Sequence, residues 1–130
     1  MGILLDTSIA IYLRDEAAAF GGRISNVTSP VFLSAVSHVE LEGGVVAIPN
    51  LAKLRRMKLD VLLGNLDIID FTDGMAKIYG RIVAQTGFSR RKIIDRMIAA
   101  TALANDLTLI TTNGEDFADI DGLKLEIWQA

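Results

Sequence analysis

The chain has 130 residues, a net charge of −3, no cysteine and a single histidine, His38. A chain of this length forms one domain and can bury a substantial core. The lack of cysteine excludes disulfides and thiolate metal sites, and one histidine excludes a His-rich zinc centre. A bound metal is therefore expected to be a hard cation held by oxygen ligands.

The chain is unusually apolar, with 51% hydrophobic residues and a mean hydropathy of +0.38. These values favour a sheet buried on both faces, or an apolar surface that contacts a partner or a second copy. No apolar run reaches the length of a membrane span, and the first run meets Asp6 too early for a signal peptide. We therefore expect a cytoplasmic protein without a membrane segment.

Apolar runs and turn residues divide the chain into alternating strands and helices. Strands are predicted at 2–5, 31–33, 66–71, 108–111 and 123–127, and helices at 9–14, 38–46, 51–63, 74–86 and 93–104. Residues 15–28 give mixed signals, because an alanine run is followed by two glycines. The alternation predicts one domain over 1–130, a three-layer α/β/α sandwich with a mostly parallel sheet.

Four acidic residues stand out by their positions in the predicted elements: Asp6, Glu40, Asp95 and Asp116. Each has an ordinary alternative role, as a helix cap, a charge at a helix N-terminus or a loop acid. For Glu40 that role is a capping box opened by Ser37, three residues earlier. In a parallel sheet, however, Asp6 and Asp116 reach the same edge, and Asp95 begins the helix before the fourth strand.

Crowded carboxylates repel one another, and a divalent cation is the usual compensation. Oxygen ligands alone suit Mg²⁺ or Mn²⁺. Such an ion lowers the pKa of a bound water and neutralises a phosphate under attack, and Asn113 with Thr111 or Thr112 is placed to orient those waters. The acids therefore indicate phosphodiester cleavage.

Basic residues gather in two clusters despite the net negative charge: Lys53, Arg55, Arg56 and Lys58 in the first, and Arg90, Arg91, Lys92 and Arg96 in the second. The ordinary interpretation of either cluster is a solvated helix face. The second cluster precedes or adjoins Asp95, and there we expect contacts with a phosphate backbone.

The segments LLDTS at 4–8, SHVELEGG at 37–44, IIDRMIAATAL at 93–103 and ITTNGEDF at 110–117 resemble the motifs of the PIN-domain family in order and spacing. They are most similar to those of its VapC-type toxin ribonucleases. The resemblance covers essentially the whole chain, and its most specific part is the DxxIAAxAL block followed by TxNxxDF.

The resemblance implies an Mg²⁺- or Mn²⁺-dependent endoribonuclease with its four acids at Asp6, Glu40, Asp95 and Asp116. The first, third and fourth are expected to bind metal, and Glu40 to complete the ligand set or position the attacking water. Ser8, Thr112 and Asn113 match the family's accompanying polar positions. The resemblance also implies a homodimer and a VapB-type antitoxin, whose C-terminal segment lies in a groove and places a basic side chain in the site.

Arg96 departs from the family pattern, which more often has an apolar or small residue after the third acid. Two roles are open for it, a contact with substrate phosphate or neutralisation of a partner's acid. Glu42, two residues after Glu40, makes the assignment of the second acid slightly ambiguous, although Glu40 aligns better.

Two other functions compete with the nuclease. A haloacid-dehalogenase-like phosphohydrolase would use Asp6 as a nucleophile, but that chemistry wants a second aspartate at position 8, which is Ser8. A non-catalytic module that binds RNA or a partner is the other, and an intact set of four acids counts against it.

Overall fold

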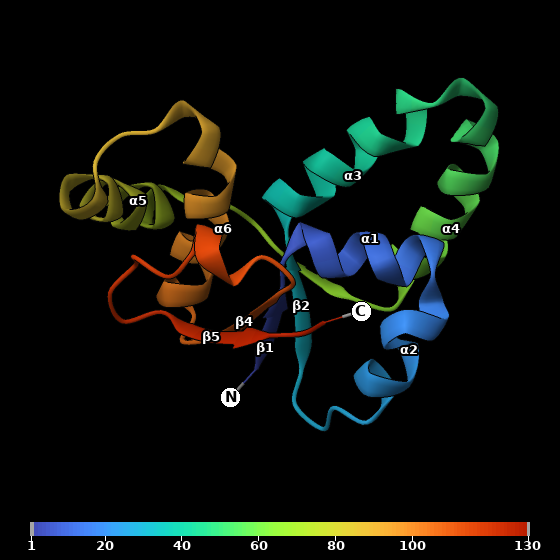
Figure 1. Ribbon diagram of the computed structural model, residues 1–130, viewed down its shortest axis with the longest axis horizontal. Coiled ribbons are helices and arrows are strands. Elements are labelled where there is room, and N and C mark those ends of the chain that lie inside the picture. Colours follow the sequence, from blue (N-terminus) through green and yellow to red (C-terminus); the bar gives the residue numbers. More distant parts are fainter. Residues whose placement is uncertain (1, 130) are drawn as a thin grey trace.

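Figure 1 shows the computed structural model, which describes residues 2–129 and places five short strands between helices. The strands are β1 (Ile3–Leu5), β2 (Val31–Ser34), β3 (Asp67–Ile69), β4 (Thr108–Thr111) and β5 (Lys124–Ile127). They form one sheet in the order β3-β2-β1-β4-β5, and every neighbouring pair is parallel. The predicted parallel sheet is confirmed.

Six α-helices and three short 3₁₀ helices connect the strands. The α-helices are α1 (Thr7–Asp15), α2 (Ala17–Ser25), α3 (Ala35–Ala47), α4 (Ala52–Gly64), α5 (Asp73–Thr86) and α6 (Ile93–Ala104), and the 3₁₀ helices are η1 (Pro49–Leu51), η2 (Arg90–Lys92) and η3 (Gly114–Asp116). Among the described residues, no helix is long and apolar enough to cross a membrane.

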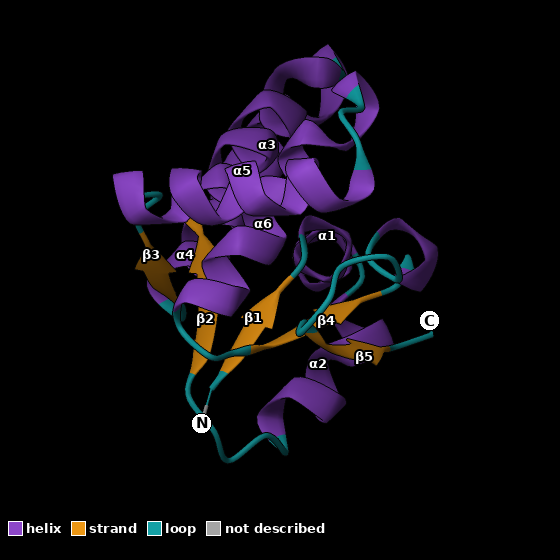
Figure 2. Ribbon diagram, turned by 90° about the vertical axis from the view of Figure 1, so that its left-hand side faces the viewer, coloured by secondary structure: helices purple, strands orange, loops and turns teal. Residues whose placement is uncertain are grey.

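Two apolar cores lie on opposite faces of the sheet, because successive residues of a strand point to opposite sides. Leu4 and Leu109 belong to the core beneath α5 and α6, whereas Leu5 and Ile110 belong to the core shared with α1, α2 and α4. Figure 2 shows α6 and α4 on opposite sides of the twisted sheet. The three-layer sandwich predicted from the sequence is therefore confirmed.

Helix α2 lies within residues 15–28, for which the sequence signals are mixed. Its two glycines do not interrupt the helix, because Phe20 is only 1% exposed and its ring packs on Tyr12 and Trp128. Tertiary packing of this aromatic cluster outweighs the low helix propensity of glycine.

The start of α3 differs from the prediction. Ser34, at the end of β2, is the N-cap and accepts a hydrogen bond from the main-chain nitrogen of Val36, with Oγ at 3.0 Å. Ser37 lies inside the helix and is fully buried, so the predicted capping box is wrong. Glu40 is consequently not engaged in capping the helix.

The strand order places a topological switch next to β1. The chain passes from β1 to β2 on one side, and β4 joins β1 on the other. In open parallel sheets, ligands bind beyond the carboxyl ends of the strands at such a point. Asp6 follows β1 and η3 follows β4, so the topology brings both segments to this position.

Candidate active site

Asp6 is the most firmly held of the four predicted acids. Its residue is 4% exposed, and its main-chain nitrogen donates to Ile110 O at 2.9 Å, which joins the ends of β1 and β4. Oδ1 accepts from the Thr7 main-chain nitrogen at 2.9 Å, so Asp6 also caps α1. Oδ2 accepts from Thr111 Oγ1 at 2.6 Å and from Ser8 Oγ at 2.9 Å. The side chain of Asp6 therefore caps α1 and also lies at the predicted site.

The polar residues after β4 support Asp6 indirectly. Thr112 donates its main-chain N–H to Ser8 Oγ at 3.2 Å, and Asn113 donates its own to Thr111 Oγ1 at 3.0 Å. These bonds orient the two hydroxyls that in turn donate to Asp6. Of the two threonines left open by the sequence, Thr111 supplies the hydroxyl that contacts Asp6.

Glu40, on the exposed surface of α3, joins the same site through a residue that the sequence reasoning missed. Thr7 Oγ1 lies 2.6 Å from Glu40 Oε1 and 2.9 Å from Ser37 Oγ. Since a hydroxyl has one proton, Thr7 donates to the carboxylate and the Ser37 hydroxyl faces its lone pairs. No pattern in the sequence singled out Thr7, because its partners are some 30 residues away in the chain.

Glu42 contacts other residues than Glu40 does, and Glu40 stays the predicted second acid. Arg56 donates to both Glu42 oxygens at 2.6 and 3.1 Å, and His38 Nε2 lies 2.9 Å from Oε2. These hydrogen bonds lower the pKa of Glu42 to about 2. Glu42 is thus part of an ion-pair network between α3 and α4.

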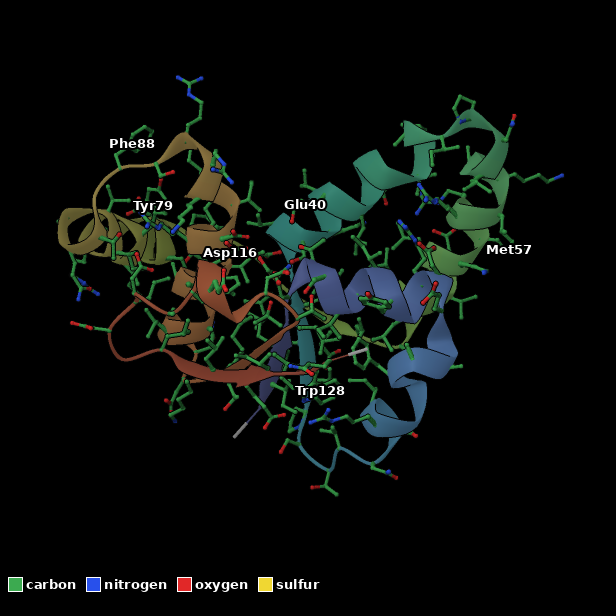
Figure 3. All side chains as sticks on the ribbon, in the orientation of Figure 1. Glu40, Met57, Tyr79, Phe88, Asp116 and Trp128 are labelled. Atoms are coloured by element: carbon green, nitrogen blue, oxygen red, sulfur yellow. The ribbon has the colours of Figure 1, made fainter. Side chains whose placement is uncertain are left out.

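Asp95 is half-buried in the first turn of α6, and the charges of the other acids affect its pKa. Burial first, and then the charges of Asp6, Asp116 and Glu40, raise its pKa to about 6 against the opposing charge of Lys92. Figure 3 shows Glu40 and Asp116 near the centre of the molecule, where the start of α1 meets α3 and α6. The structure therefore brings the four predicted acids into one electrostatic unit.

The basic residues of the second cluster divide into two groups. Arg90 and Arg91 are exposed on η2, and Lys92 is half-exposed beside them. Arg96, in contrast, is 2% exposed, and its guanidinium contacts Gly87 and Asp119. Arg96 is therefore not available to RNA, and its inclusion with the other three was wrong.

The first basic cluster, on α4, is partly neutralised within the chain. Arg55 Nη1 donates to the Gly44 carbonyl at 2.8 Å, and Arg56 pairs with Asp60 at 2.6 Å as well as with Glu42. This arrangement agrees with the interpretation of that cluster as a helix surface.

The four acids have the donor chemistry that a divalent cation takes. Within residues 2–129, no three acidic or histidine side chains are arranged as they stand to hold a metal ion. The donor chemistry nevertheless fits, because burial and then the charges of the three other carboxylates raise the pKa of Asp95 to about 6. A hard cation relieves this repulsion and takes oxygen ligands of this kind.

The sequence matches the PIN domain family over residues 3–123, and the chain belongs to that family. It is 29% identical to Ribonuclease VapC2 of Rickettsia felis over 132 residues, which cover 96% of each chain. It is 27% identical to the tRNA(fMet)-specific endonuclease VapC of Shigella flexneri, again over 96% of each chain.

Solved structures give the same result for the fold. The crystal structure of VapBC2 from Rickettsia felis, bound to a DNA fragment from their promoter, contains a chain that matches with a TM-score of 0.87 at 28% identity. The match covers 99% of this chain and 100% of that chain. The VapC-type resemblance read from the sequence motifs is thereby confirmed.

Proposed function

We propose that the chain is a metal-dependent endoribonuclease and the toxin component of a VapBC-type toxin–antitoxin system. One observation carries the proposal, namely the convergence of Asp6, Glu40, Asp95 and Asp116 at the carboxyl ends of β1 and β4. The names of its relatives, a ribonuclease and a tRNA-specific endonuclease, support RNA as the substrate.

Asp6, Asp95 and Asp116 are the residues that hold Mg²⁺ or Mn²⁺ in this proposal. When bound, the ion lowers the pKa of a water ligand and neutralises the phosphate under attack. Asp6 is fixed for this task, because hydrogen bonds from Thr111 and Ser8 orient its Oδ2. Burial and then its acidic neighbours raise the pKa of Asp95 to about 6, so a bound cation would favour its ionised form.

Glu40 has a different role in the reaction. Its side chain is exposed, and the Thr7 hydroxyl holds Oε1 and leaves Oε2 without a hydrogen bond from that donor. A carboxylate fixed by one oxygen is suited to accept a proton from the attacking water with the other. We therefore assign Glu40 to orient and deprotonate that water.

The exposed residues Arg90, Arg91 and Lys92 form the proposed contact with RNA phosphates. They occupy η2, immediately before α6, and the charge of Lys92 already acts on Asp95. Cations beside the acidic site attract the phosphate backbone of the substrate toward it.

An apolar groove between α1, α2 and α4 supports an antitoxin partner. It has a volume of about 530 Å³ and is lined by Leu13, Ile24, Leu54, Met57, Val61 and Leu62 among others. Large apolar side chains are also exposed elsewhere, at Val39, Val46 and Phe88 (Figure 3 shows the last). We propose that a cognate VapB-type antitoxin covers the groove, that the chain forms a homodimer and that it acts in the cytoplasm.

The competing phosphohydrolase receives no support from the geometry of Asp6. Both of its carboxylate oxygens accept hydrogen bonds, and Ser8 uses its hydroxyl as one of the donors. The second candidate function is a non-catalytic module that binds RNA. An assay of RNA cleavage distinguishes it from the nuclease, since both bind RNA.

The test is cleavage of a panel of structured cellular RNAs, tRNAs included, by the purified chain with Mg²⁺, with Mn²⁺ and with a chelator. Asp6→Asn is the inactive variant, and Asp106→Asn, an exposed acid at the opposite edge of the sheet, is its matched control. Discrete cuts that need metal and vanish only in Asp6→Asn support the nuclease. RNA binding without cuts in any of these conditions supports the non-catalytic module.

A further inference from the structure

Arg96 has an environment that is costly for a charged side chain. Its side chain is 3% exposed, Nη1 donates to the Gly87 carbonyl at 2.5 Å, and Nη2 lies 3.4 Å from Asp119 Oδ2. Nε is buried and has no hydrogen-bond partner in the described part of the chain. Burying a guanidinium with one donor unsatisfied is unfavourable. The contacts that its other nitrogens make must therefore offset this cost.

Those contacts join three segments around the acidic site. Gly87 ends α5 with a φ of +89° and begins the loop to η2. Arg96 follows Asp95 in α6, and Asp119 belongs to the segment after η3, three residues beyond Asp116. Figure 1 shows this segment crossing beside α6, which agrees with the contact between their side chains.

The two acids carried by these segments repel each other. Asp95 lies in the first turn of α6 and Asp116 ends η3, so each segment carries a negative charge at the proposed metal site. Two like charges repel each other, so without a contact that joins the two segments they favour a wider separation of α6 from η3. The short η3 is restrained by main-chain hydrogen bonds from Asp116 N to Asn113 O and from Phe117 N to Gly114 O, each 3.1 Å long, and by the buried ring of Phe117.

We propose that Arg96 is a positioning residue, which through Asp119 and Gly87 holds the helix of Asp95 and the segment of Asp116 together, so that both acids reach one shared cation when it binds. Arg96 itself touches neither substrate nor metal. This inference rests on the proposed metal site. It also explains why a long cation follows the third acid, since successive residues of a helix point about 100° apart and Arg96 cannot face the same side as Asp95.

The experiment measures Mn²⁺ affinity by electron paramagnetic resonance on the full chain, with thermal unfolding of each variant in parallel. Arg96→Met removes the guanidinium, Arg96→Lys keeps the charge without the fork of donors, and Asp119→Asn weakens the contact from the exposed side. Asp106→Asn is the control, because it removes an exposed ion pair with Lys124, 2.8 Å long, far from the acids.

We expect Arg96→Met and Asp119→Asn each to weaken Mn²⁺ binding by about 10-fold, with Arg96→Lys between them and the wild type, and Asp106→Asn unchanged. A pure charge effect has opposite signs in the first two variants, because one loses a positive and the other a negative charge. Weaker binding in both therefore identifies positioning. At saturating Mn²⁺ the cleavage rate recovers in Asp119→Asn.

Opposite shifts in Arg96→Met and Asp119→Asn, or unchanged affinities with only a lower melting temperature, overturn the inference. If Arg96→Met does not fold, Asp119→Asn decides, since the exposed Asp119 is not part of a core. A wild-type chain that fails to bind Mn²⁺ overturns the proposed metal site as well, whereas unchanged variants of a wild type that binds it overturn the role of Arg96 alone.

Discussion

Thr111 donates a hydrogen bond of 2.6 Å to Asp6 Oδ2 across 105 positions of the chain, at the point where β4 and β1 end side by side. Both residues are buried, so this bond is shielded from water. A hydroxyl that donates to a carboxylate in such a place fixes the direction in which the remaining lone pairs point. The parallel register of β1 and β4 brings Thr111 to Asp6, and this hydrogen bond then orients the Asp6 carboxylate in the proposed site.

Thr111→Val is predicted to lower the free energy of unfolding by about 1–2 kcal/mol, because Asp6 loses a buried charge-assisted hydrogen bond. RNA cleavage is predicted to fall as well, since Asp6 is no longer oriented. The matched control is Thr101→Val, which removes an equally buried hydroxyl that donates to Met97 O at 2.9 Å in α6. A similar loss of cleavage in both variants would show that the effect is general destabilisation.

Asp95→Asn is predicted to stabilise the metal-free protein at pH 8. The folded pKa of about 6 is above the value of 3.8 that Asp95 has as an isolated side chain. The folded state therefore binds the proton more tightly, and stability falls as pH rises from about 4 to about 6. Since Asp95 is only half-buried, screening reduces the gain from the variant to about 1 kcal/mol.

Urea unfolding at pH 8 and at pH 4 measures this gain for Asp95→Asn. The difference between variant and wild type is expected to be largest at pH 8 and to shrink toward pH 4, where Asp95 is protonated in the folded state and partly protonated in the unfolded state. A variant that is destabilised equally at both pH values contradicts the proposed repulsion among the acids.

Thr7→Val is predicted to slow RNA cleavage by about 10-fold, because Glu40 loses the hydroxyl that orients its carboxylate. Glu40→Gln is predicted to slow it by about 100-fold, the lower end of the effect expected from a lost general base. The double variant is expected to be no slower than Glu40→Gln, since both changes remove one function. Single-turnover rates measure this coupling, and losses that multiply would mean that Thr7 acts independently of Glu40.

Arg90→Ala combined with Arg91→Ala is predicted to weaken RNA binding without abolishing cleavage at saturating substrate. Each phosphate contact contributes about 0.7 to the slope of log affinity against log salt for single strands, so the slope is expected to fall by about 1.4. Affinities measured over a series of salt concentrations in an Asp95→Asn background test this. Lys53→Ala, an exposed cation of α4, serves as the control. An unchanged slope would mean that η2 is merely solvated.

The sequence predicted the sheet and the convergence of acids because both depend on short-range patterns. Alternating apolar runs fix which strands are buried, and a parallel sheet brings Asp6 and Asp116 to one edge whatever the side-chain details. The error at α3 arose because Ser34 and Ser37 are equally good caps by residue type. Only the length of β2 decides between them, and strand boundaries are poorly specified by the sequence.

The roles of Thr7 and Arg96 depend on contacts that no local pattern encodes. Thr7 contacts α3, and Arg96 reaches a loop 23 residues further along the chain. Successive residues of a helix point about 100° apart, so Arg96 and Asp95 face different directions. This geometry alone argues against a contact of Arg96 with RNA bound at Asp95. What Arg96 would contact instead requires the tertiary structure.

The central claim is that the four acids form one metal-dependent site for RNA cleavage. Its most direct test is the single-turnover cleavage rate of Asp95→Asn against wild type, on an RNA that the wild type cuts, with Mn²⁺ at saturation. We predict a loss of at least about 100-fold in a variant that remains folded and still binds RNA. A cleavage rate equal to that of the wild type, still abolished by chelator, would contradict the account.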